Sequence, residues 1–452
     1  MVSLKLGAKG QGCVALLGGF LILASLGQMH TITNMTPYVI SYMHERLDSD
    51  VNYSFGIWIS TGSISFYASS MPISGLLAQK FDISKLIIIS GFLNSLSHFA
   101  SAYALTQHKV LFFLTYSILT GIAIGLVSGV ILQASLAWFP KRKGLVVGTC
   151  TVASGLGSIL LAPFQTLYIN PSNLLPNSNT SMFDDKDILN RTPESLQVTG
   201  IVVTILAVLG ISLFRPKQVE SSNEAENNMD DMLEDNPDYN KLKEAESLTL
   251  REALRVPNFS LFGAIVFLSY FSVSVLMANV KTVAQTAIRD DRFLMIAFTL
   301  AEVLNIISRF FWGLVSDCLS FKVPLVINCI VYGTILITFP YIVWLPGVNR
   351  ACFAIWTVLL FHCLAGVSVL ISFGTAASFG AKNVAFIFGM IFVVTVPSSI
   401  ICALVLYFID VNKFIKEVFL AAGLASYCAS IAAVFLKDTK LPKYFTCNRC
   451  SR

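Results

Sequence analysis

Long apolar segments recur along the whole chain and limit its fold more than any other feature of the sequence. The hydrocarbon core of a bilayer is about 30 Å thick, so a helix needs about 20 mostly apolar residues to cross it. Twelve segments reach that length, near residues 13–40, 55–78, 85–105, 109–138, 144–169, 197–214, 259–280, 293–315, 323–345, 351–378, 384–409 and 416–436. We therefore predict an all-α membrane protein with twelve transmembrane helices in two groups of six.

The composition indicates the same class of protein. Of the 452 residues, only 13% are charged and 55% are hydrophobic, and the mean hydropathy is +0.71. A soluble protein would carry about 25% charged residues. The net charge of +5 is spread over short loops, so it does not indicate a nucleic-acid partner. We expect the lipid bilayer to surround the chain, in the plasma membrane rather than an internal membrane.

The apolar segments divide the chain into four regions. These are an N-terminal six-helix half at 1–214, a linker at 215–257, a C-terminal six-helix half at 258–436 and a tail at 437–452. The linker is rich in Asp and Glu, which predicts a disordered cytoplasmic connection that ends in a short helix from Leu248 to Val256. Its segment Asn236-Pro237-Asp238-Tyr239 resembles a tyrosine sorting motif, so a trafficking adaptor is a candidate partner.

Lysine, arginine and glycosylation sequons together predict the orientation. Basic residues favour the cytoplasmic side of membrane helices. With both termini inside, the short inside segments hold fourteen Lys and Arg residues and the outside segments hold ten. Sequons begin at Asn52, Asn179 and Asn190, and all three lie in loops that this topology places outside. We expect glycans on these asparagines and both termini in the cytoplasm.

One apolar segment, from Phe293 to Asp317, carries polar residues in its interior. They are Glu302, Asn305 and Arg309. A charged side chain at the centre of a bilayer costs at least about 2.5–3.5 kcal/mol, so such residues mark functional sites. In a helix, Glu302 and Arg309 share one face about 10 Å apart, with Asn305 between them. The sequence therefore predicts that this face borders a polar cavity, which the other helices enclose.

Two short patterns occur once in each half. The first ends the second apolar segment as Gly75-Leu76-Leu77-Ala78-Gln79 and the eighth as Gly313-Leu314-Val315-Ser316-Asp317. The second opens the fifth segment as Phe139 to Gly148 and the eleventh as Phe379 to Gly389. Parallel repeats of six helices, with a binding site between them near the midplane, are typical of the major facilitator fold.

The repeated segments also resemble known families. Trp138 to Gly148 resembles the signature shared by the monocarboxylate transporter and oxalate/formate antiporter families, in which an aromatic-Phe-x-basic-basic run enters a fifth helix rich in Gly and Ala. Asn305 to Asp317 is similar to their eighth helix, and Phe379 to Asn383 to their loop before the eleventh. The acidic-Gly signature of the monocarboxylate transporters is absent, as is the second cation that oxalate carriers have in helix eleven.

The resemblance implies a secondary active transporter of a small organic anion, with a monocarboxylate preferred, that works by alternating access. Arg309 would bind the carboxylate, because a guanidinium forms a bidentate pair with that group. Asn305 would orient the anion. Glu302 would carry a coupling proton, since burial disfavours the charged carboxylate; equally, it could be the fixed counter-ion of Arg309.

Charged residues at the predicted cytoplasmic ends of the helices are candidates for a gate. Lys141 and Arg142 precede the fifth apolar segment, and either Asp82 or Asp317 could pair with them. The positive-inside rule alone also accounts for the two basic residues.

Polar residues are dense in the outer half of the first apolar segment. Gln28, His30 and Asn34 all lie there. Such a density is high for a helix that faces lipid, so we expect part of it to line the cavity.

Two alternatives to a monocarboxylate transporter stay open. One is a carrier of another solute, such as a dicarboxylate, an amino acid or a drug-like compound, and the other is a nutrient sensor that does not transport. The chain has no pattern typical of an enzyme, and we expect no cofactor and no metal site. Cys447 and Cys450 supply only two of the four ligands of a structural zinc site, so we favour a free or lipidated tail.

Overall fold

The structure is a computed structural model of the chain. It describes residues 8–51, 53–139, 142–172, 174, 176–177, 182–216, 248–288, 291–343, 345, 349–380, 383–409 and 414–438. Every regular element in these residues is a helix. Asn52, Lys141 and Asn179 lie outside the described residues, as do the sorting motif and the Cys447–Cys450 pair.

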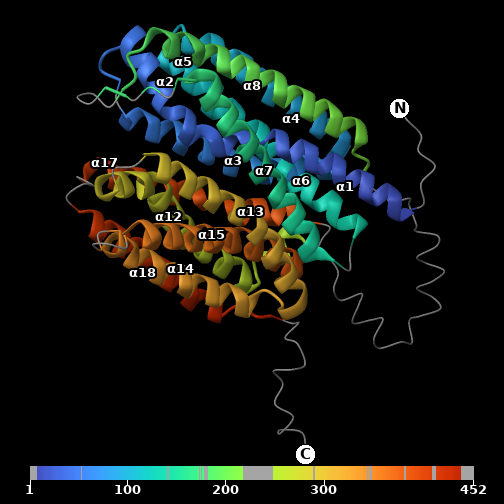
Figure 1. Cartoon of the computed structure of the whole chain (residues 1–452). Coiled ribbons are helices and arrows are strands. Elements are labelled where there is room, and N and C mark those ends of the chain that lie inside the picture. Colours follow the sequence, from blue (N-terminus) through green and yellow to red (C-terminus); the bar gives the residue numbers. More distant parts are fainter. Residues whose placement is uncertain are drawn as a thin grey trace, which may run out of the picture.

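The helices form two bundles of six crossings each, which lie one above the other in Figure 1. The first bundle contains α1 (Ala8–Ser25), η1 (Gly27–Thr31), α2 (Ile32–Arg46), α3 (Tyr53–Lys80), α4 (Ile83–Leu105), α5 (Lys109–Phe112), η2 (Phe113–Leu119), α6 (Thr120–Trp138), α7 (Lys143–Ile169) and α8 (Lys186–Leu213). The second contains α12 (Pro257–Ala287), α13 (Asp291–Leu319), α14 (Lys322–Ile342), α15 (Asn349–Phe379), α16 (Val384–Phe392), α17 (Thr395–Phe408) and α18 (Ile415–Val434). The prediction of twelve transmembrane helices in two halves is confirmed.

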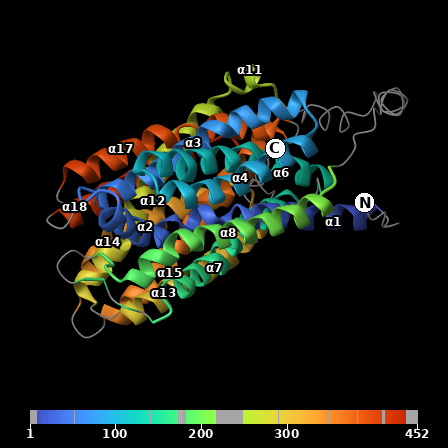
Figure 2. The ribbon, with the colours of Figure 1, turned by 90° about the horizontal axis from the view of Figure 1, so that it is seen from above.

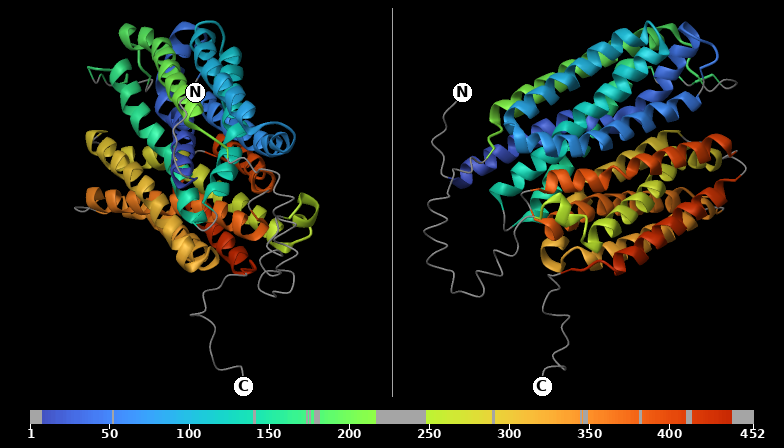
Figure 3. Two further views of the ribbon diagram at one scale, coloured as in Figure 1. Left: turned by 90° about the vertical axis from the view of Figure 1, so that its right-hand side faces the viewer. Right: turned by 180° about the vertical axis from the view of Figure 1, so that it is seen from behind.

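The last helix of each half ends beside another helix of the same half, at one end of the molecule. Trp138, at the end of α6, donates a hydrogen bond to the carbonyl of Arg215, just after α8 (3.0 Å). Asn258, at the start of α12, donates to the carbonyl of Lys437, just after α18 (2.8 Å). The start of α1 lies at this end as well (Figure 3). We call it the terminal end; it is the end for which the sequence predicts the cytoplasmic side.

The opposite end carries the loops that are predicted to lie outside. There, Lys109 at the start of α5 forms an ion pair with Asp48, just after α2. The hydrogen bond from Lys109 holds the pKa of the Asp48 carboxyl below its ordinary value. The amide of Phe183 also donates to Ser41 Oγ (2.9 Å), so polar contacts close the loops over this end of the N-terminal half.

Eleven helices of the described part are long and apolar enough to cross a membrane by composition alone. The crossing outside this set is α3, which is rich in serine. Several of its hydroxyls are satisfied within the helix: Ser63, Ser70 and Ser74 donate to carbonyls three or four residues earlier. Because α3 packs against α6 and α16, it exposes less of its surface to lipid than an outer helix does.

Three crossings are not continuous α-helices, which the apolar pattern did not predict. The first tightens to a 3-10 turn at η1, and the fourth contains the π-helix η2. The eleventh breaks between α16 and α17 at Val393 and Val394. Pro397 has no N–H to bond the carbonyl of Val393, so it cannot continue α16 and instead occupies the first turn of α17.

Two other helix bounds differ from the prediction, each for a local reason. Helix α8 begins eleven residues before the apolar run at 197, because Asp185 caps it by accepting from the amides of Asp187 and Ile188 (3.0 and 3.1 Å). The short helix before α12, α11 (Leu250–Ala253), is only one turn long and lies at the edge of the molecule (Figure 2). It cannot run into α12, since Val256 precedes Pro257 and is extended.

The repeated segments pair crosswise between the halves. Gly75 of α3 lies against Phe386 of α16, where an added Cβ would be 2.4 Å from the Phe386 backbone. Gly313 of α13 lies against Gly144 of α7, where an added Cβ would be 2.6 Å from the carbonyl of Gly144. The pattern that ends the second apolar segment thus contacts the one that opens the eleventh, and the pattern that ends the eighth contacts the one that opens the fifth. Glycine lets the backbones approach this closely.

Buried apolar side chains form three clusters. The largest includes Met71 of the N-terminal half and Phe388 of the C-terminal half, so both halves share it. The other two each belong to one half, around Tyr38 and around Phe419, toward the end opposite the termini. The halves therefore share a core toward the terminal end and keep separate cores toward the opposite end.

Large apolar side chains also cover the outer surface. Phe92, Leu167, Phe408 and Phe435 are 66%, 68%, 79% and 68% exposed. Apolar surface of this extent on a soluble monomer would cause association. In a bilayer it is the surface that contacts lipid.

Candidate functional site

Arg309 lies where α13 of the C-terminal half meets α7 of the N-terminal half. Its side chain is 9% exposed. Nε donates to Asn305 Oδ1 (3.1 Å), and Nη1 donates to Ser154 Oγ (3.4 Å) and to the carbonyl of Thr151. Nη2 donates no hydrogen bond within the described residues. One guanidinium therefore connects both halves and keeps one nitrogen for another acceptor.

Asn305 is almost fully occupied in holding this arginine. It is 1% exposed, its Oδ1 accepts from Arg309 and its Nδ2 donates to the carbonyl of Phe361 on α15 (2.6 Å). Its amide therefore fixes the guanidinium with respect to α15. This arrangement leaves little of Asn305 free to contact a solute.

Gly155 of α7 lies against α13 beside Arg309. An added Cβ there would be 3.0 Å from Ile306, a tight contact, and 3.7 Å from Arg309 Cζ, an ordinary van der Waals contact. On the other side of α13, Ile307 and Leu314 are 56% and 54% exposed. The helix thus has a polar inner face and an apolar outer face, as its sequence predicts.

Glu302 lies on the same helix, two turns from Arg309, and is half-buried. No hydrogen bond or ion pair joins it to Arg309 or to any other described residue. The two side chains are near enough for a charge interaction, but they do not touch. The structure thus contains no direct salt bridge between them.

The three polar residues of the first crossing have different surroundings. Gln28 is buried and donates to Asn94 Oδ1 on α4 (2.9 Å). Asn34 donates to the carbonyl of Ala162 and to Thr166 on α7 (3.2 and 3.1 Å). Both stabilise the N-terminal half. His30, in η1, has an exposed side chain. The cavity prediction remains a prediction, and His30 is the residue whose geometry suits it.

Two tyrosines from different halves also lie near Arg309. Tyr67 of α3 and Tyr270 of α12 both contact Phe392, the last residue of α16, edge to face at 5.3 and 5.1 Å between ring centroids. Both are half-buried, and both phenol groups are close enough to Arg309 for a charge interaction. They were missed in the sequence because they come from separate helices and no spacing links them.

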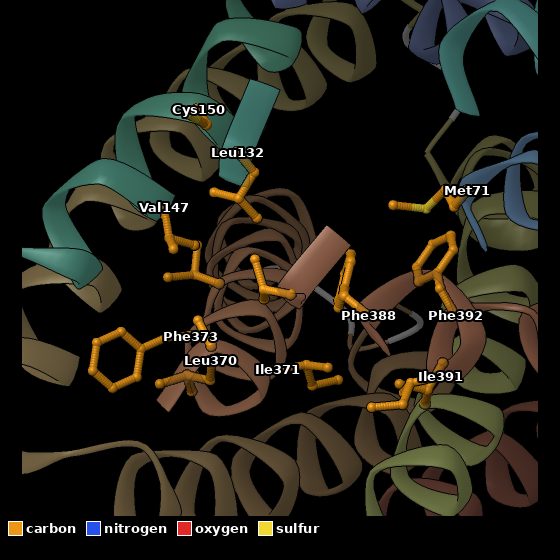
Figure 4. Packing of buried hydrophobic residues seen from close by; sticks show 14 of the residues in the cluster. Met71, Leu132, Val147, Cys150, Leu370, Ile371, Phe373, Phe388, Ile391 and Phe392 are labelled. Atoms are coloured by element: carbon orange, nitrogen blue, oxygen red, sulfur yellow. The ribbon is translucent and has the colours of Figure 1, made fainter. Parts of the chain in front are cut away.

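Below these residues, toward the terminal end, the site is closed by apolar side chains. Figure 4 shows Leu132, Val147, Phe388 and Phe392 among those that fill the space between the halves. These buried apolar side chains come from both halves, so the polar site has an apolar floor.

Asp317 of α13 connects the halves beneath this floor. Its Oδ1 and Oδ2 accept hydrogen bonds from the amides of Gly144 and Leu145 at the start of α7 (2.8 and 3.1 Å). A carboxylate at a helix N-terminus interacts favourably with the helix dipole. Of the other gate candidates, Arg142 is exposed beside this contact, whereas Asp82 caps its own helix by accepting from the amide of Ser84 (3.0 Å).

The remaining predicted site residue that the structure describes is Asn190. It is exposed near the start of α8, and its Oδ1 accepts from Arg46 (3.3 Å). It lies at the opposite end from the termini, on the side predicted to be outside. Whether it carries a glycan stays a prediction.

A separate cavity of about 350 Å³ lies away from Arg309. It is a groove between α12 and the α16–α17 break, lined by residues that include Phe259, Gly263 and Met390. None of the charged or amide residues described above lines it. We therefore do not assign the solute to it.

Two six-helix bundles with a buried cation at their contact define a multi-pass membrane transporter. The family follows from its sequence: the profile of the Major Facilitator Superfamily matches residues 12–403. The chain belongs to the major facilitator superfamily.

Individual proteins match this chain at low sequence identity or over a short segment. Apicoplast pyruvate carrier 1 of Toxoplasma gondii is 22% identical over 86% of this chain and 82% of that protein. Human Monocarboxylate transporter 14 is 32% identical, over 23% of this chain and 20% of that protein. Among solved structures, the E. coli proton:xylose symporter XylE aligns with a TM-score of 0.70 and 12% identity, covering 94% of each chain. At this identity the last comparison shows the fold alone.

Proposed function

We propose that this chain transports a small monocarboxylate by alternating access and that Arg309 binds the carboxylate. The observation that carries the proposal is the Nη2 group, which has no acceptor among the described residues although the rest of the guanidinium is held. A buried cation is costly unless an anion accompanies it. Since Glu302 makes no direct pair with Arg309, a bound carboxylate would supply the missing charge.

A single fixed cation favours a monoanion. A dianion would bring about one negative charge that nothing nearby neutralises in a medium of low dielectric. Apicoplast pyruvate carrier 1 supports pyruvate as the first solute to test.

The contacts of Arg309 suggest how binding would be coupled to movement. Thr151 and Ser154 accept from it across the boundary between the halves. A carboxylate that draws the guanidinium toward itself would weaken these bonds. Binding would then favour separation of α7 from α13, which alternating access requires at the terminal end.

In the predicted orientation, the terminal end faces the cytoplasm, and the shared core, the Gly144–Gly313 contact and Asp317 close it. Asp317 is the proposed gate residue, with Arg142 beside it. Asn305 is proposed as a positioning residue for Arg309 rather than as a contact of the anion. Glu302 is proposed to carry a coupling proton, since it is half-buried and makes no hydrogen bond or ion pair within the described residues.

The test is uptake of labelled pyruvate by proteoliposomes that contain the purified chain. Arg309→Gln should abolish uptake, and Arg309→Lys should lose nearly as much because an ammonium lacks the planar fork. Arg46→Gln and Arg46→Lys, at the opposite end, are matched controls and should transport normally. Near-normal uptake by Arg309→Gln would show that Arg309 has a structural role and does not bind the carboxylate.

A thermal-shift measurement with pyruvate separates the alternatives, because a ligand that binds the folded state stabilises it. Stabilisation without uptake would support a nutrient sensor. No response to pyruvate, together with a response to an amino acid or another solute, would support a different carrier.

A further inference from the structure

The groove between α12 and the α16–α17 break lies on the outer surface of the C-terminal half. One face of α12 forms its first wall, with Phe259, Gly263 and Phe267 in successive turns. Met390 and Pro397, on either side of the break, belong to the second wall. Ser260 is the only lining residue with a polar side chain, and it is exposed. The groove thus presents hydrocarbon to the bilayer.

The groove has room for a chain-like occupant. Its volume of about 350 Å³ falls within the range of roughly 300–1,000 Å³ typical of small-molecule sites. A Cβ added at Gly263 would meet nothing within 4 Å. The continuous α12 thus lies beside a broken helix, with open space at Gly263.

Exposed cations lie near the start of α12, at the terminal end and close in the chain to Phe259 of the groove. Arg251 on α11 and Arg255, four residues before Phe259, are both exposed. Lys437 is exposed as well, and its carbonyl accepts from Asn258 in the first turn of α12. Two acids lie nearby: Glu252 accepts from the amide and hydroxyl of Thr249 in the cap of α11 (2.8 Å each) and is near enough to Arg255 for a charge interaction, and Asp438 follows Lys437. The three cations outnumber these two acids.

The residues around α11 suit a position at the membrane surface. Leu254 is 53% exposed beside the exposed Arg251 and Arg255. An apolar side chain between basic ones is typical of a segment that lies in the interface, with its apolar side toward the acyl chains. Basic residues in this position attract anionic lipids.

We propose that this groove binds an anionic phospholipid of the leaflet at the terminal end, with an acyl chain against Gly263 and the phosphate at Arg251 and Arg255. The site has two parts that match the two parts of such a lipid: the apolar groove fits an acyl chain, and the exposed cations fit the phosphate. A neutral lipid would leave the excess positive charge without an anion, and a soluble anion would leave the groove empty. The lipid would also contact the break beside Phe392, whose ring touches Tyr67 and Tyr270.

The experiment compares the melting temperature of the purified full chain in nanodiscs of phosphatidylcholine alone and of phosphatidylcholine with phosphatidylglycerol. Phosphatidylglycerol should raise the melting temperature of the wild-type chain by mass action. Gly263→Trp should abolish this increase by filling the groove, and Arg251→Gln with Arg255→Gln should abolish it by removing the cations. Gly263→Leu replaces the tryptophan variant if that protein does not fold.

Matched controls make the result specific. Ala421→Trp places the same bulk on the exposed face of α18, and Lys85→Gln with Arg215→Gln removes two exposed cations of the terminal end from the N-terminal half. Both should keep the wild-type response. If phosphatidylglycerol still raises the melting temperature of the Gly263 variants fully, the groove is not where the lipid binds. If it does so for the arginine variant, Arg251 and Arg255 do not bind the phosphate. Loss of the response in the controls would reduce the effect to general charge or bulk and would overturn the proposal.

Discussion

At the scale of single residues, the properties of Arg309 follow from the rigidity of its guanidinium. The group is planar and carries five N–H donors in fixed directions. Asn305, one turn earlier, and the backbone of α7 occupy Nε and Nη1, so the direction of Nη2 is set as well. A flexible ammonium held by the same partners would have no such fixed direction.

Glu302 gives the first prediction at this scale. Because Glu302 makes no hydrogen bond or ion pair in the part of the chain that the structure describes, Glu302→Gln should leave the melting temperature of the chain unchanged. It should remove the pH dependence of net pyruvate uptake between pH 6 and 7.5 while exchange of labelled for unlabelled solute persists. The reason is that glutamine imitates the protonated state and cannot release a proton to reset the empty carrier.

The double variant with Arg309→Gln distinguishes the other role. If Glu302 were a counter-ion, Glu302→Gln would leave an unpaired buried cation, at a cost of roughly 3–5 kcal/mol. The melting temperature would then fall, and adding Arg309→Gln would restore it. A stable Glu302→Gln chain with fully pH-dependent uptake would contradict both roles.

The two tyrosines give the second prediction. If their hydroxyls contact the anion that Arg309 holds, Tyr67→Phe and Tyr270→Phe should each weaken the apparent affinity for pyruvate by about tenfold. This change corresponds to a loss of roughly 1.4 kcal/mol of binding free energy. The rings stay, so packing on Phe392 and the melting temperature should not change. Tyr427→Phe is the matched control: its hydroxyl bonds Thr334 on the outer surface (2.9 Å), and uptake should be normal. Unchanged affinity in both site variants would assign the tyrosines to packing alone.

At the scale of helices, the decisive contact is that between α7 and α13. Two glycines bring the backbones together, and Asp317 accepts from two amides that an isolated α7 would leave without partners. The contact therefore depends on both halves, whereas most helix caps in this chain are local. Asp185, for example, caps the helix that it precedes.

This difference gives the third prediction. Asp317→Asn removes the charge that favours the N-terminus of α7, an interaction worth about 0.3–1 kcal/mol at exposed sites. The terminal end should therefore open more often. A cysteine placed at Val147, which is 0% exposed in the shared core, should react faster with a maleimide in a background that lacks other reactive cysteines.

Asp185→Asn is the control for this experiment. It makes the same chemical change at a cap that does not cross between the halves, so labelling at position 147 should stay slow. Equal labelling of Asp317→Asn and the unsubstituted chain would show that Asp317 does not hold the terminal end closed.

At the scale of the whole molecule, the one shared and two separate apolar cores indicate a carrier that is closed at the terminal end. A shared core needs the halves in contact, and two separate cores allow each half to move as a unit. In alternating access the shared core would have to open while the separate cores persist. Close packing resists intermediate states, so such a change is expected to occur between discrete arrangements.

The orientation gives the fourth prediction. Expressed in a eukaryotic cell, the chain should carry glycans on Asn52, Asn179 and Asn190, and replacement of each by glutamine should remove one glycan and increase electrophoretic mobility. The linker should be cut by protease only after the membrane is permeabilised. Cleavage of the linker in intact cells would reverse the orientation and move the closed end to the outside.

The sequence by itself determined the twelve crossings, the two halves and the polar face of α13. Each of these depends on local periodicity and on the cost of placing polar groups in lipid, which are properties of a single segment. It also placed Glu302 and Arg309 on one face, since seven residues of helix make nearly two turns.

Only the tertiary structure decided what that face meets. Nη1 of Arg309 bonds α7, Asp317 caps a helix 173 residues away in the sequence, and Tyr67 and Tyr270 meet at Phe392. The apolar pattern also could not reveal the 3-10 turn in the first crossing, because a change of hydrogen-bond register leaves composition unchanged. Contacts between helices depend on how two surfaces fit together. The local pattern of one segment predicts the surface of that helix but not which other helix surface it contacts.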